Sequence, residues 1–322
     1  MNNEWYNVFM KMLYKKYPKK NQLAEALMDL LCIEREAVYR RLRQDVPFPA
    51  NELVKIASAW NISLDEITGI MSSKVSFQMH LANYLTPSEE DMKFFRKRVR
   101  ALERLKNESN SEYILVCNHL ARSFSTGFTN LYRFYVFKWA YEYCNSCNEK
   151  SSPTLADTVI PEKLLKEMNV YHKLMRYVTN TTYILDSMIF DSYIRDIQFF
   201  HSIFLITDED KEILKKELYA LLDYMLEIAN NGCFPETKNK IHLYVSMLHI
   251  NTNYSYFYNG KTEIARIHAF NMYDNITYNP AMMEDFKIWL QKKKRTSILI
   301  SEADERSRIK FFMEQRQLID SL

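Results

Sequence analysis

The stretch LMDLLCIEREAVYRRLRQDVPFPANELVKIASAWNISLDE, residues 27–66, has the most specific pattern in this chain. Leucines at helical spacing lead up to Cys32, and a second short helix follows that ends before Pro47. Two further short helices complete the stretch. Before it, residues 5–16 form an amphipathic helix, and Asn21 is suited to cap the next one. We therefore expect five helices and one small all-α domain.

The second helix of this stretch has a clear division between an inner and an outer face. Val38 and Leu42 lie four residues apart and are expected to face the core with Ile33. The outward positions of the same helix then carry mostly charged side chains. These are Arg35, Glu36, Tyr39, Arg40 and Arg43.

The order of residues here resembles the Cro/cI-type (XRE-type) helix-turn-helix of bacterial and phage regulators. The resemblance is carried by Leu27-Met28-x-x-Leu31-Cys32-Ile33, by the helix from Glu34 to Leu42, and by the closing segment from Leu53 to Glu66. It extends over residues 21–69 of the 322. The chain departs from the family at Cys32, which replaces a usual glycine, and at Met28, which replaces a small residue. It also has an acidic residue, Glu34, at the start of the second helix.

This resemblance implies a DNA reader. In such proteins the second helix enters the major groove and reads bases with residues near its N-terminus. The expected base-reading residues are Arg35, Glu36, Tyr39 and Arg40. The expected phosphate contacts are Lys19, Lys20, Asn21, Gln22, Arg41 and Arg43. One such module buries too little surface for tight specific binding, so we expect a homodimer on a two-part site in double-stranded DNA.

The overall composition excludes several other classes of protein. The chain has 47% hydrophobic and 26% charged residues, and its net charge of +3 requires any basic face to be local. Its four glycines are scattered, so neither a phosphate-binding glycine loop nor a nucleophile elbow can be built. We expect no enzyme activity, no cofactor and no metal site. Cys144 and Cys147 have metal-ligand spacing, but without further ligands nearby they are more often ordinary cysteines.

Residues 1–75 are expected to form the helical domain, 76–110 a linker and basic helix, and 111–322 a larger domain. The basic helix, residues 93–106, lies either near DNA phosphates or with a solvated face. The larger domain is expected to be helical at first, with a strand at 113–117 and a helix at 184–204. It then becomes β-rich after Lys238, with a hairpin around Asn259-Gly260. The expected fold class is mainly α and α+β overall, with a late antiparallel sheet.

These features favour a transcription regulator whose C-terminal domain dimerises or senses a small molecule or a protein effector. The alternative is a protein-interaction or antitoxin-like module in which DNA binding is secondary. An enzyme with an attached DNA reader is disfavoured by the missing glycine loops and ligand clusters. With no signal-like segment and no apolar run long enough to span a bilayer, we expect no membrane association and a cytoplasmic location.

Overall fold

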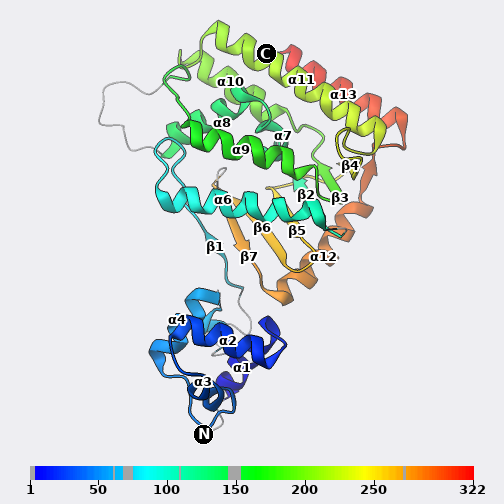
Figure 1. Cartoon of the computed structure of the whole chain (residues 1–322). Coiled ribbons are helices and arrows are strands. Elements are labelled where there is room, and N and C mark those ends of the chain that lie inside the picture. Colours follow the sequence, from blue (N-terminus) through cyan, green and yellow to red (C-terminus); the bar gives the residue numbers. More distant parts are fainter. Residues whose placement is uncertain (1–3, 61, 68–74, 109, 144–153, 271–272) are drawn as a thin grey trace. The chain divides into compact units, whose positions relative to one another are not determined.

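The computed structural model describes residues 4–60, 62–67, 75–108, 110–143, 154–270 and 273–322. The chain forms two compact units, Met1–Ser76 and Phe77–Leu322 (Figure 1). The first is helical, and the second combines helices with one mixed sheet, so the expected mainly helical α+β class is confirmed at that level. The segment expected to be a linker and basic helix belongs to the second unit, because its helix packs within that unit.

The first unit contains five helices among its described residues: α1 (Glu4–Lys16), α2 (Lys20–Leu31), α3 (Arg35–Leu42), α4 (Ala50–Trp60) and α5 (Leu64–Ile67). Their apolar faces meet in one core around Phe9, Leu27 and Val38. The prediction that Asn21 caps the second helix was wrong. The N-cap residue is Lys19, whose extended backbone (φ −91°, ψ 120°) marks the boundary, and no side chain caps this end.

The connection from α2 to α3 is a tight turn. Cys32 adopts the left-handed conformation (φ 56°, ψ 47°), and its N–H donates to the carbonyl oxygen of Met28 at 2.8 Å. This is the arrangement that glycine usually provides at the end of a helix. The turn therefore stays short without a glycine.

The second unit is built on an eight-stranded sheet in the order β1-β7-β6-β5-β2-β3-β4-β8. Its strands are β1 (Gln78–Met79), β2 (Glu112–Cys117), β3 (Asn180–Leu185), β4 (Lys240–Ser246), β5 (Tyr254–Tyr258), β6 (Glu263–Ala269), β7 (Tyr273–Thr277) and β8 (Ser297–Leu299). The expected strand at 113–117 and the hairpin of β5 and β6 are confirmed. However, the sheet is not purely antiparallel, because β2, β3 and β4 are parallel at its centre.

Helices cover both faces of this sheet (Figure 1). One face packs against α6 (Glu89–Glu103), η1 (Arg104–Asn107), α7 (Arg122–Ser125), α8 (Thr129–Tyr143), α9 (Glu162–Met175), α10 (Asp191–Ser202), α11 (Asp208–Asn231) and α13 (Glu305–Asp320). The other packs against α12 (Pro280–Arg295). Strand β2 shows the division, since Tyr113 and Leu115 join the first core while Ile114 and Val116 join the second. The helix predicted at 184–204 was wrong at its start: residues 180–185 are β3, and α10 begins at Asp191.

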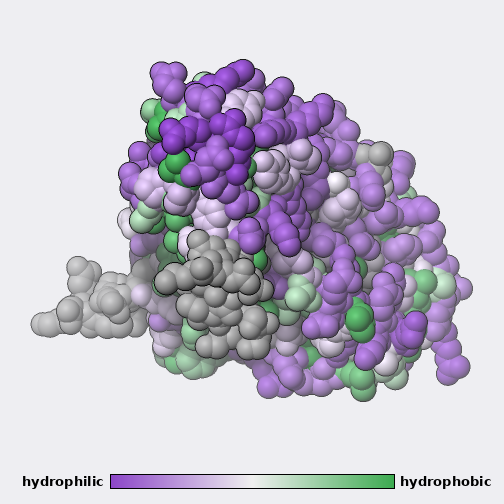
Figure 2. Space-filling model, turned by 90° about the horizontal axis from the view of Figure 1, so that it is seen from below, coloured by the Kyte–Doolittle hydropathy of each residue, from purple (hydrophilic) through white to green (hydrophobic). Residues whose placement is uncertain are grey.

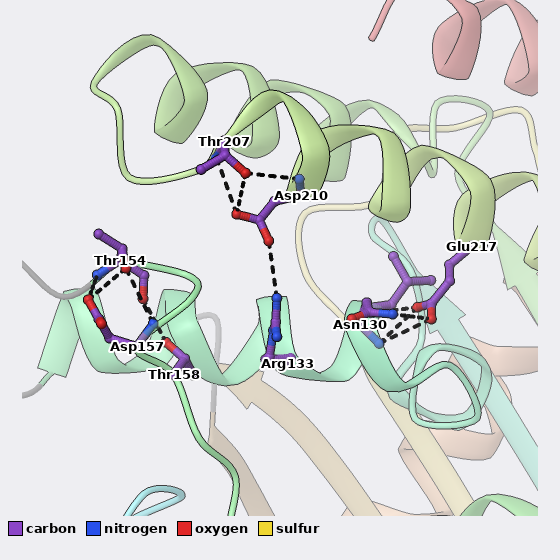
Figure 3. Close-up of polar contacts among 9 residues, drawn as sticks. Asn130, Arg133, Thr154, Asp157, Thr158, Thr207, Asp210 and Glu217 are labelled. Atoms are coloured by element: carbon purple, nitrogen blue, oxygen red, sulfur yellow. Dashed lines mark hydrogen bonds and ion pairs between the residues drawn. The ribbon is translucent and has the colours of Figure 1, made fainter.

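Two carboxylates of α11, Glu217 and Asp210, hold α8 in place (Figure 3). Glu217 accepts hydrogen bonds from the backbone N–H groups of Asn130 and Leu131 at 2.9 and 2.8 Å, which caps the start of α8. One turn later Arg133 donates to Asp210 at 3.1 Å. These contacts hold in place the helix that lines one wall of the cavity described below.

The face of the molecule drawn in Figure 2 has no single large hydrophobic patch among its coloured residues. Hydrophilic residues cover most of its coloured atoms, and hydrophobic residues form small scattered groups. Within the described residues, no helix is long and apolar enough to cross a membrane.

Candidate nucleic-acid interface and a second candidate site

The outward face of α3 presents three of the expected base-reading residues to solvent. The side chains of Arg35 and Glu36 are 61% and 74% exposed, and Arg40 is exposed as well. Arg35 lies 3.7 Å from Glu25, an exposed pair of the kind that contributes little and exchanges readily. Among the described residues no carboxylate forms an ion pair with Arg40. The side chains of Arg35, Glu36 and Arg40 are thus accessible to a ligand on the outward face of α3.

The fourth expected base reader, Tyr39, joins α3 to the beginning of α2. Its hydroxyl donates to Oδ1 of Asn21 at 3.1 Å, and the ammonium of Lys20 lies 5.6 Å from its ring centroid. Lys19 and Gln22 are exposed beside them. Because no side chain caps α2, the backbone N–H groups of its first turn add to the positive character of this corner.

Arg41 was expected to hold a phosphate, and the structure places it elsewhere. Its Nε and Nη2 donate to the two carboxylate oxygens of Glu52 at 2.5 and 2.8 Å, and its Nη1 donates to the Ala37 carbonyl at 3.1 Å. The two side chains are only 16% and 11% exposed. This guanidinium therefore ties α3 to α4 and has its hydrogen bonds satisfied inside the unit.

Arg43 remains on the surface, as expected. It contacts Asp45 at 2.9 Å and Glu36 at 3.0 Å, and these hydrogen bonds raise the pKa of its guanidinium above the usual value. Both partners are half-exposed or more. Exposed pairs of this kind can exchange a carboxylate for a phosphate at small cost.

The second unit contains a cavity of about 300 Å³ beside the carboxyl end of β2. At this point β2 has a parallel neighbour, β3, on one side and an antiparallel one, β5, on the other. The carboxyl end of a parallel strand at such a change in strand order is a common place for ligands. The walls come from the loop after β2, from α6, α8 and α10, and from β6 and β7.

A carboxylate, Asp274, is at the centre of the polar groups on the sheet side of this cavity. It accepts a hydrogen bond from Arg122 at 2.6 Å and from Nδ1 of His268 at 3.1 Å, and Arg98 lies 3.7 Å away. Burial alone would raise the pKa of this carboxyl. The surrounding Arg122, His268 and Arg98 instead hold its pKa well below the usual range. Asp274 is therefore charged at neutral pH.

Next to this cluster, His119 is held between two asparagines. Its Nδ1 lies 2.9 Å from Oδ1 of Asn118, and its Nε2 lies 2.9 Å from Nδ2 of Asn253. Burial lowers the pKa of His119 to about 3, and the nearby His268 and cationic side chains act in the same direction. The ring is thus neutral at physiological pH, with both nitrogens occupied.

None of these cavity residues was found from the sequence. Aromatic side chains near the cavity have two roles: Tyr135 lines the cavity, while Phe124, Tyr132 and Phe137 are buried in the core. Arg98, from the predicted basic helix, also faces this cavity. A usable signal was the presence of Arg266 and His268 in the second strand of the predicted hairpin.

Cys144 and Cys147 lie outside the described residues. In the part of the chain that is described, no group of three or more His, Cys, Asp and Glu side chains is arranged to hold a metal ion. No protein-family model matches the chain, and comparison with curated proteins and with solved structures finds no similar protein.

Proposed function

We propose that this protein is a sequence-specific DNA-binding regulator in which α3 reads bases in the major groove. The observation that carries the proposal is the exposed N-terminal half of α3, which follows α2 after a tight left-handed turn. Arg35 and Arg40 are the side chains with the reach and donor geometry to bind guanine. Glu36 can accept a hydrogen bond from cytosine, and Tyr39 supports the face from the side of α2.

The phosphate contacts are assigned to the corner where α2 begins and to the end of α3. Lys19, Lys20, Asn21 and Gln22 surround the uncapped N-terminus of α2, where backbone N–H groups favour an anion. Arg43 supplies a contact at the other end of α3. Arg41 is left out of this set, because its guanidinium is bound to Glu52.

Binding of this kind is expected from a homodimer, with the second unit providing the contacts between chains or sensing a signal. A short recognition helix reaches only a few base pairs, and two copies double the surface that reads DNA. The pattern of exposed charge on α3 also suits an acidic protein partner, which is the alternative function. The two functions can be distinguished by the ligand of the purified chain, which is duplex DNA for the first and a protein partner for the second.

Fluorescence anisotropy with labelled duplexes of mixed sequence tests the proposal. The full chain is titrated at several salt concentrations between about 50 and 200 mM, where each phosphate contact contributes about −0.9 to the slope of log K against log salt. Lys20→Ala should reduce the magnitude of this slope by about 0.9, the contribution of one phosphate contact. The control is Arg195→Ala in α10, which removes an exposed arginine paired only with Asp191.

Salt-dependent binding that is weakened by Lys20→Ala and unchanged by Arg195→Ala supports the proposal. Two results would overturn it: no binding to duplex DNA at the lowest salt concentration, or equal weakening by both variants. A protein that co-purifies with the chain in a fixed ratio, while DNA binding is absent, would establish the alternative.

A further inference from the structure

We infer that the cavity beside β2 is a binding site for a small phosphorylated sugar or polyol. This inference goes beyond DNA binding and stands whether or not the first unit contacts DNA. It rests on the distribution of charge in the cavity, on buried polar atoms that have no partner, and on the different chemistry of its two walls.

The part of the cavity around Asp274 carries more positive than negative charge. Three guanidinium groups, from Arg98, Arg122 and Arg266, line it together with one carboxylate, Asp274. Arg122 and Arg98 both approach Asp274, whereas Arg266 forms no ion pair among the described residues. The local excess of two positive charges around Asp274, counted without Lys138, Asp196 and Glu142 of the opposite wall, matches a phosphate monoester, which carries a charge of about −1.5 to −2 at neutral pH. Guanidinium is also the side-chain group that best fits phosphate geometry.

Polar atoms on the cavity wall lack the partners that buried groups normally have. Nε2 of His268, Nε of Arg266 and Oγ of Ser192 are all buried and make no hydrogen bond in the described structure. The His268 side chain is only 6% exposed, and its Nδ1 is occupied by Asp274. Leaving such a group unsatisfied costs about 1–3 kcal/mol, so three around one cavity point to a ligand that satisfies them.

The opposite wall has the chemistry of a hydroxyl-binding surface. Lys138 of α8 pairs with Asp196 of α10, and Glu142 lies one turn beyond Lys138. Burial raises the pKa of Glu142, although Lys138 opposes this shift. Carboxyl oxygens accept hydrogen bonds from sugar hydroxyls, and Ser192 lies on the same side. A phosphate would therefore face the arginines while the hydroxyl-bearing part faces α8 and α10.

The size of the cavity limits the ligand. A volume of about 300 Å³ is at the small end of ligand pockets, which suits a pentose or hexose phosphate. Four tyrosines, Tyr113, Tyr135, Tyr171 and Tyr193, line the space and lower the local polarity. In such surroundings each charge-assisted hydrogen bond to a phosphate is strengthened.

Isothermal titration calorimetry on the full chain tests this site with ribose 5-phosphate and glucose 6-phosphate as probes. Ribose, glucose, inorganic phosphate and citrate serve as comparisons. Arg266→Gln should weaken the binding of the sugar phosphates about tenfold or more, because it removes a positive charge that forms no ion pair among the described residues. Arg195→Gln, an exposed arginine outside the cavity, is the matched control.

Ser192→Ala separates a binding role from a structural one. Removing a hydroxyl that makes no hydrogen bond should leave the thermal midpoint of the free protein unchanged or raise it, while affinity for the sugar phosphates falls about threefold or more. Binding of the sugar phosphates that depends on Arg266 and Ser192 supports the site. It is overturned if neither sugar phosphate binds, if inorganic phosphate or citrate binds as tightly, or if both cavity variants bind as wild type does.

Discussion

Arg41 of α3 and Glu52 of α4 form a largely buried two-point ion pair, with N–O distances of 2.5 and 2.8 Å, between two helices of the first unit. The pair fixes the orientation of α3 by a contact on the side of the helix opposite to its exposed residues. One of the four arginines in this region is therefore used to position the helix. The other three, Arg35, Arg40 and Arg43, remain on its surface.

Arg41→Ala should lower the free energy of unfolding by about 2 kcal/mol, because it leaves the buried carboxylate of Glu52 without its partner. Arg43→Ala removes only exposed ion pairs and should cost less than about 0.5 kcal/mol. Urea denaturation followed by circular dichroism measures both. Equal effects of the two substitutions would contradict a structural role for Arg41.

Gly127→Ala should destabilise the second unit by about 1–3 kcal/mol through overpacking. A methyl group at this position would lie 2.4 Å from Nε2 of His172. The ring cannot move away easily, because Nδ1 donates to the Ser123 carbonyl and Nε2 accepts from Arg176, both at 2.8 Å. In a His172→Ala background the same substitution should cost almost nothing, and this double-mutant cycle is read by thermal unfolding. Additive effects would show that the predicted clash does not occur.

His172 should also make the stability of the second unit depend on pH. Burial lowers its pKa from 6.5 to about 4, and the neighbouring Arg176 adds to this effect. The unfolded chain therefore binds more protons than the folded one between these pH values, so stability is full above pH 6.5 and is lost as the pH falls toward 4.

The test is the difference in free energy of unfolding between wild type and His172→Gln. This difference should be constant above pH 7 and should shift against wild type below pH 6.5, by at most about 1.4 kcal/mol per pH unit. Urea denaturation at pH 8, 6 and 4.5 gives the three values needed. A difference that stays the same at all three would show that His172 is not held neutral by its surroundings.

Local patterns were sufficient to predict much of the fold. The hairpin of β5 and β6 was predicted from Asn259-Gly260, where the Asn259 side chain accepts from the N–H of Thr262 at 2.8 Å. In contrast, β3 was missed and its last two residues were assigned to a helix, because residues 181–185 are buried on both faces and show no alternation. Strand β7 was missed because its sequence, YDNIT, contains Asp274 and Asn275, which are unfavourable in strands.

The two candidate sites also differ in how far local sequence predicts them. The exposed face of α3 follows from the spacing of Val38 and Leu42 within one helix, so it could be predicted. The use of Arg41 as a tether could not, because Glu52 lies on another helix. The cavity depends on still longer distances: Arg122 and Asp274 are 152 residues apart in the sequence. No local pattern indicates that they meet.

The most direct test of the account is selection of bound duplexes from a random DNA pool by the full chain, repeated with Arg35→Ala and Arg40→Ala. We expect wild type to enrich one sequence with two related half-sites, and each variant to lose preference for guanine at one position. Reduced affinity with an unchanged preferred sequence would make these arginines phosphate contacts. If wild type enriches no sequence at all, the proposal that α3 reads DNA is contradicted.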